Sequence, residues 1–140
     1  SLGPSSMSGA DWWVANGSYG YNEYLAHQLP GRIGPPAKIP LVFDAARSTV
    51  MPWHYSDPPA YDGDCRGPRS NGPHMKLVCI NRHQGGVNML FLDWSARKTG
   101  LKELWTLKWS EYFETNGPWT KAGGVLPEDW PQWLRKFKDY

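Results

Sequence analysis

The spacing of apolar and polar residues predicts a small sheet with short helices beside it. Alternating or short apolar runs are typical of strands, which are expected at 39–44, 76–80 and 86–99. The last of these should be a hairpin with its two arms at 87–93 and 95–100. Apolar residues at helical spacing predict helices near 22–29, 101–113 and 129–137. The chain is therefore expected to form an α+β fold around a small, mainly antiparallel sheet.

Two polar residues are placed to start helices. Asn22 precedes the first predicted helix, which Pro30-Gly31 would end, and Asp129 precedes the apolar residues of the last one. Oxygen atoms of Asn and Asp side chains can accept hydrogen bonds from the free N–H groups at a helix start. Both residues are therefore predicted to be N-caps.

Turn-forming residues occupy much of the remaining chain. Its 13 Pro and 15 Gly favour long loops over a helical bundle, and the longest loop is expected from 47 to 73. Loops of this length without regular structure are often functional. Residues 1–10 are small and polar and are expected to be flexible, whereas 11–140 should form a single globular domain.

The charge distribution gives no sign of a nucleic-acid partner. The formal net charge is +2, and the basic residues are scattered rather than clustered along one segment. A cluster is what binding to a phosphate backbone requires. Nor does the sequence contain the roughly 18 consecutive apolar residues that a membrane span needs.

One stretch raises the question of catalysis. In residues 81–100, NRHQGGVNMLFLDWSARKTG, His83 and Asp93 could act as a base and the carboxylate that orients it. No nucleophile or metal motif accompanies them. The alternative is structural: His83 hydrogen-bonds backbone at the end of a loop, Asp93 fixes the hairpin, and Gly85-Gly86 supplies left-handed residues before the strand. The structural role is favoured, and no enzymatic activity is expected.

The two cysteines suggest a disulfide. Cys65 and Cys79 flank a segment rich in Gly and Pro, and a bond closing a loop of about 15 residues would stabilise the fold by roughly 3 kcal/mol. An oxidising compartment would then be implied. The alternative is a zinc site formed by the two cysteines with His74 and His83, although their spacing lacks the usual close pair of ligands.

Three aspartates in the long loop are the candidates for a cation. Asp57, Asp62 and Asp64 supply carboxylates of the kind that bind calcium. Their spacing is not that of an EF-hand, and ordinary aspartate turns are the alternative. No cofactor is expected for this chain, and calcium is the alternative.

The aromatic residues are unusually numerous, with nine Trp, seven Tyr and four Phe. Trp105, Trp109, Trp130 and Trp133 lie on the predicted helical stripes and are expected in the core or at a subunit interface. The loop aromatics have three alternatives: subunit contact, covering of the core, or stacking on sugar rings. These loop residues are Trp12, Trp13, Trp53 and Tyr55.

Several segments together resemble a known family. His83 and Asp93 are separated by nine residues within an Arg-His-x-Gly-Gly-x-Asn-x-Leu-Phe-x-Asp pattern that includes Asn88. The chain also contains GSYGYNEYL, IPLVFDA, GLKELWTLKW, GPWTKAGG and DWPQWLRKFKDY. Over most of 12–140, these motifs resemble the C-terminal globular part of the type IV pilin-like, type II secretion pseudopilin-like proteins of planctomycetes.

The chain departs from the family pattern at one position of this signature. The family has Asp-Gly where this chain has Asp93-Trp94. Asp-Gly suits a two-residue turn in which both residues have positive φ, a conformation that strains Trp. A longer turn, or a strained Trp94, is therefore expected.

The resemblance implies a function without catalysis. It implies a structural subunit of an extracellular pilus-like or pseudopilus filament or secretion apparatus, with other pilin-like subunits as partners in a homo-oligomer or filament. Contact with a membrane is expected only through the family's apolar assembly helix, which these 140 residues do not include. The expected location is extracellular or at the cell surface, with the periplasm as an alternative. The competing hypothesis is a secreted or cell-surface module that binds polysaccharide through exposed Trp and Tyr.

Overall fold

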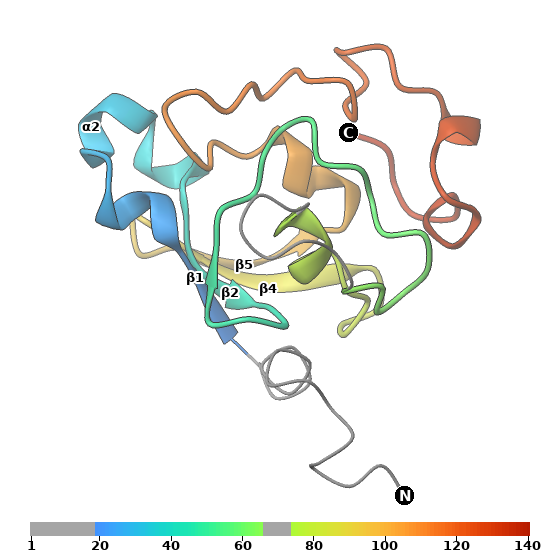
Figure 1. Cartoon of the computed structure of the whole chain (residues 1–140), viewed down its shortest axis with the longest axis horizontal. Coiled ribbons are helices and arrows are strands. Elements are labelled where there is room, and N and C mark those ends of the chain that lie inside the picture. Colours follow the sequence, from blue (N-terminus) through green and yellow to red (C-terminus); the bar gives the residue numbers. More distant parts are fainter. Residues whose placement is uncertain (1–18, 66–73) are drawn as a thin grey trace, which may run out of the picture.

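The computed structural model of the chain describes residues 19–65 and 74–140. Its centre is a five-stranded mixed sheet, in the order β3-β1-β2-β4-β5 (Figure 1). The strands are β1 (Tyr19–Asn22), β2 (Pro40–Asp44), β3 (Thr49–Val50), β4 (Gly86–Phe91) and β5 (Ala96–Gly100). Only β1 and β3 pair in parallel, and the other three pairings are antiparallel. The fold is thus broadly α+β, and the prediction of a mainly antiparallel sheet is confirmed.

Within the described residues, the helices are all short. The α-helix α2 covers Pro30–Ile33, and the other helical segments are 3₁₀ turns. These turns are η2 (Glu23–Ala26), η3 (Pro36–Lys38), η4 (His74–Leu77), η5 (Lys102–Thr106), η6 (Pro127–Asp129) and η7 (Gln132–Leu134). Within the described residues, no helix is long and apolar enough to cross a membrane.

One face of the sheet supports the core. Figure 1 shows the helices and long loops of the described chain lying on one side of the strands. Phe43 and Met89 point from neighbouring strands into this layer, where Trp109 meets Phe43 edge-on at 5.1 Å between ring centroids. Trp105, Trp109 and Trp130 are buried, as predicted, and Trp133 packs partly buried against the same core. The aromatic surplus therefore covers a sheet that has little helix to cover it.

Some predicted elements are wrong. Residues 76–80 form no strand: their apolar run begins in η4 and continues as irregular chain, buried around Val78 and Cys79. A short apolar run cannot by itself distinguish a strand from another buried segment. The predicted helix near 22–29 is reduced to η2, the one over 101–113 to η5, and the one over 129–137 to η7. Pro30 and Gly31, predicted to end the first helix, begin α2 instead. The strand β1 was not predicted, because the glycine at position 20 is typical of a turn rather than of a strand.

One of the two predicted N-caps is confirmed and the other is wrong. The side chain of Asn22 accepts a hydrogen bond from the Tyr24 N–H at 3.2 Å, so its role as N-cap of η2 is confirmed. Its amide also donates to the carbonyls of Pro40 and Trp109, which ties β1 to β2 and to the core. Asp129 does not start a helix over 129–137: its carboxylate accepts from the Leu126 N–H at 2.8 Å and closes η6 instead.

The C-terminal segment packs against the start of β4 and the end of β5. A Cβ atom at Gly85 would lie 2.8 Å from the Phe137 ring, and one at Gly100 would lie 2.6 Å from the Tyr140 hydroxyl. The segment is held by the buried Lys102, whose ammonium donates to Asp139 at 2.7 Å. The glycines are therefore required by the residues that cover them.

Candidate functional site

The face of the sheet opposite the core carries two rows of side chains. Strand register places Tyr21 beside Val42, Val42 beside Leu90, and Leu90 beside Ala96. We call Tyr21, Val42, Leu90 and Ala96 the apolar row. One step along the strands lie Tyr19, Asp44, Asn88 and Lys98, which we call the polar row. Both rows lie on this outer face because side chains alternate along a strand.

A shallow groove runs between these rows. Its volume is about 420 Å³, and its lining includes Tyr19 from β1, Val42 from β2, Leu90 from β4, and Ala96 and Lys98 from β5. Tyr19 is 69% exposed and Val42 is 37% exposed, so apolar surface faces outward at its centre. The groove can therefore hold a group with an apolar part and a polar or charged neighbour.

Asp44 of the polar row forms a His–Asp pair, but not the predicted one. His83 Nε2 lies 3.0 Å from Asp44 Oδ2, which also accepts from the Asn88 N–H at 2.8 Å. The expectations that His83 meets Asp93 or binds backbone are thus both corrected. Asp44 ends β2 and becomes the anchor for the loop before β4. This loop holds Lys98 as well, whose ammonium donates to the Gln84 carbonyl at 3.1 Å.

The glycine pair before β4 has two different roles. Gly85 has φ = 88°, as predicted for a left-handed residue, and it follows Gln84, which has φ = 50°. Gly86 has no positive φ, and its requirement is close approach: a Cβ there would lie 2.5 Å from Lys98 Cε. The stem of Lys98 therefore lies flat over Gly86 at the end of the groove.

The hairpin tip has the features expected from a tryptophan at the position where the family has glycine. The Phe91 N–H donates to the Ser95 carbonyl, and the Trp94 N–H donates to the Phe91 carbonyl. These hydrogen bonds enclose residues 92–94, so the loop is longer than two residues, and the φ of 69° at Trp94 makes it strained as well. Its ring is 77% exposed.

Asp93 stabilises this tip, as predicted. Its Oδ1 accepts from the Ser95 hydroxyl at 2.6 Å and from the Ser95 N–H at 3.0 Å. These hydrogen bonds lower the pKa of the Asp93 carboxyl, and the bond from the Ser95 hydroxyl has the largest effect. Asp93 is thus an exposed anion next to the exposed ring of Trp94.

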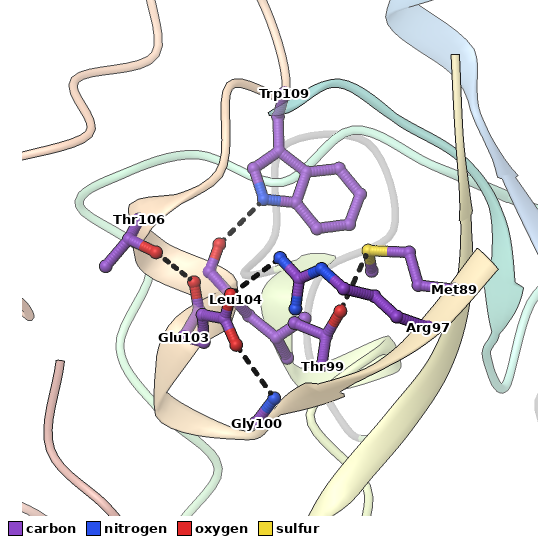
Figure 2. Close-up of polar contacts among 8 residues, drawn as sticks. All are labelled: Met89, Arg97, Thr99, Gly100, Glu103, Leu104, Thr106 and Trp109. Atoms are coloured by element: carbon purple, nitrogen blue, oxygen red, sulfur yellow. Dashed lines mark hydrogen bonds and ion pairs between the residues drawn. The ribbon is translucent and has the colours of Figure 1, made fainter. Parts of the chain in front are cut away.

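The second arm of the hairpin is fixed from the core side. Arg97 donates to Glu103 Oε2 at 2.7 Å, and the Gly100 N–H donates to Glu103 Oε1 at 3.2 Å, as Figure 2 shows. Trp109 donates from its indole to the Leu104 carbonyl in the same region. η5 therefore anchors β5, which forms one side of the groove, at two points.

A second aromatic surface lies in the long loop. Trp53 and Tyr55 are 40% and 59% exposed, with ring centroids 6.3 Å apart. Between them His54 is buried, its centroid 4.2 Å from each ring, and its Nδ1 accepts from the Glu114 N–H at 3.2 Å. Burial lowers the pKa of His54, which Glu114 partly opposes. The loop is therefore an ordered platform. Trp12 and Trp13 lie outside the described residues.

The cysteines are thiols in this structure. Cys79 is buried, and its Sγ lies 4.0 Å from the Leu101 carbonyl oxygen. Cys65 is half-buried, and its Sγ lies 4.0 Å from the Lys76 carbonyl oxygen. Burial raises the pKa of both thiols. The disulfide stays a prediction, which an intact mass two hydrogens below that of the reduced chain would support.

The metal candidates have other contacts. His74 Nδ1 accepts from the Met51 N–H at 2.8 Å, while Asp62 accepts from the Asn81 N–H and Asp64 from the Ala60 N–H. Asp57 is exposed. In the ranges 19–65 and 74–140, no three His, Cys, Asp or Glu side chains are grouped to hold a metal ion. The proposed zinc and calcium sets are therefore not assembled among these residues.

The outer-face groove could not be predicted from the sequence. Alternation within β2 and β4 indicated which residues share a face, but the pairing of β1 with β2 was needed to place Tyr19 opposite Asp44.

Comparison of the chain with protein-family models, curated proteins and solved structures finds no match.

Proposed function

We propose that this chain is a pilin-like head domain that serves as a non-enzymatic structural subunit of an extracellular pilus-like or pseudopilus filament or secretion apparatus. The observation that carries the proposal is the outer face of the sheet. Tyr19, Tyr21 and Val42 expose apolar surface there, across neighbouring strands. Contiguous exposed apolar surface with polar residues beside it is typical of an interaction site.

The arrangement of the polar residues also supports a structural role. The His83–Asp44 pair and Asn88 join the loop before β4 to the end of β2. Asp93 is used to hold the hairpin tip. The signature residues that resemble those of the pilin-like family thus position backbone around the outer face, which is what a subunit with a rigid contact surface requires.

Electron microscopy of the purified chain over a range of concentrations tests this proposal. Filaments or regular assemblies that grow with concentration are expected, with sedimentation velocity as the quantitative measure. Particles of monomer mass at the highest concentration would contradict assembly through the head domain.

Polysaccharide binding is the second candidate, and the Trp53–Tyr55 platform favours it. Two exposed rings on an ordered loop can stack on sugar rings. Titration with oligosaccharides should then change Trp fluorescence, and Trp53→Ala should remove the change. Binding that survives Trp53→Ala, or no binding at all, would exclude this platform as the sugar site.

A further inference from the structure

The hairpin turn holds Trp94 at a positive φ, but no contact within the described chain explains why a tryptophan occupies this position. A φ of 69° is unfavourable for a residue with a Cβ atom. The ring is 77% exposed, so it gains little from packing within the chain. Glycine would form the same turn without strain. Local strain of this kind is characteristic of functional positions.

The outer-face groove is large enough for an indole ring and offers it apolar contacts. Its volume of about 420 Å³ exceeds that of an indole, and Trp94 is not among its lining residues. Val42 and Leu90 supply an apolar surface on neighbouring strands, and Ala96 leaves open space beside them. An aromatic side chain lying across these three residues would bury the groove's apolar centre.

The positive charge of Lys98 favours a carboxylate next to an aromatic ring bound in the groove. The ammonium of Lys98 marks the polar end of the groove, and adjacent positions on one face of a strand are roughly 6–7 Å apart. In the hairpin tip, Asp93 precedes Trp94 directly and is exposed. A ring over the apolar row therefore brings a neighbouring carboxylate within reach of Lys98.

We propose that Trp94 of one copy of this chain inserts into the outer-face groove of a second copy, with Asp93 facing the partner copy's lysine at position 98. The inference rests on the proposed structural role and names the partner and the contact. Two copies can exchange their tryptophans about a two-fold axis and form a closed dimer, or pass them head to tail and form an open chain. The contact area is small, so association should be weak and dependent on concentration.

Sedimentation velocity on the full chain tests the contact. Trp94→Gly removes the ring and relieves the backbone, so it should weaken self-association at least about tenfold while the fold stays intact. Val42→Glu places a carboxylate at the centre of the groove and should have a similar effect. Tyr112→Ala is the control, because Tyr112 is 68% exposed on another segment; it should associate like the unmodified chain.

Mixing the two variants provides the decisive measurement. The Val42→Glu chain keeps its tryptophan, and the Trp94→Gly chain keeps its groove, so a mixture should form a 1:1 complex although each variant alone is monomeric. Circular dichroism and thermal unfolding verify that both variants are folded.

The contrary outcomes are distinct. If the unmodified chain associates and both variants do so equally well, the contact is wrong but self-assembly stands. If the unmodified chain remains monomeric at every concentration, both the contact and assembly through the head domain are overturned. Fluorescence changes with oligosaccharides that Trp94→Gly abolishes would make Trp94 a sugar contact and overturn the inference.

Discussion

The two ends of β4 share a left-handed backbone conformation, yet they differ in what surrounds it. At the first end, Gly85 has φ = 88° and lies beneath the Phe137 ring. At the other end, Trp94 has φ = 69° and its ring is exposed. One turn has the residue that the backbone prefers and is covered, whereas the other has an unfavourable residue and is open.

The difference distinguishes a residue that the fold requires from a residue that the fold does not explain. Gly85 is explained twice within the molecule, by its backbone and by the space that Phe137 occupies. Trp94 is explained by neither. Glycine would be the less strained residue there, and this is why we propose that the side chain serves a contact that the isolated chain lacks.

The largest expected effect is at the covered end. Gly85→Ala adds a Cβ at positive φ and 2.8 Å from the Phe137 ring, and it should lower the free energy of unfolding by about 3 kcal/mol. Gly63→Ala is the matched control, because Gly63 has the same φ of 88° with nothing within 4 Å. Its cost should be about 1 kcal/mol in denaturant unfolding. Equal costs would show that Phe137 does not press on Gly85.

The next effect concerns the segment that covers Gly85. Asp139→Asn leaves the buried ammonium of Lys102 without its carboxylate partner 2.7 Å away, and should lower stability by about 2 kcal/mol. Adding Lys102→Met should restore part of the loss, because no buried charge is then left. Denaturant unfolding of the single and double variants measures the coupling. Additive losses would mean that the pair does not hold the C-terminal segment.

At the open end, the expected change is an increase in the free energy of unfolding. Trp94→Gly should raise the free energy of unfolding by about 1 kcal/mol, since glycine adopts positive φ without strain. Gln84→Gly is a comparable test at φ = 50° and should also be stabilising. Thermal unfolding at low protein concentration, where association is absent, is the measurement. A less stable Trp94→Gly chain would mean that the indole packs usefully on its own molecule.

The contrast at Trp94 was partly visible in the sequence. The departure from Asp-Gly predicted a longer or strained turn, and the structure has both features. The strand at 39–44 and the hairpin were also predictable, because alternation and turn residues are local signals. Local signals were sufficient for β2 and for the hairpin, in which β4 pairs with the strand that directly follows it.

Long-range features were not predictable in this way. Gly20 looks like a turn residue, but it lies within β1, and glycine is required there because a Cβ would be 2.5 Å from the Arg47 carbonyl oxygen. The pairing of His83 with Asp44 crosses from one strand to a loop distant in sequence. In 101–113 the apolar stripe was real, since Leu104 and Trp105 are buried, but tertiary packing rather than a continuous helix buries them.

The smallest expected effect is the pH dependence of the open end. Hydrogen bonds from Ser95 lower the pKa of Asp93 in the folded chain, so this group contributes stability above its unfolded pKa that is lost as pH falls through the folded value. Asp93→Asn should therefore reduce the melting temperature slightly at pH 6, and the difference from the unmodified chain should shrink near pH 2. Thermal unfolding of both chains across this range measures the gap. A gap that stays constant would mean that the ionised carboxylate is not what holds the tip, and that the strain at Trp94 is offset by the backbone hydrogen bonds of the turn alone.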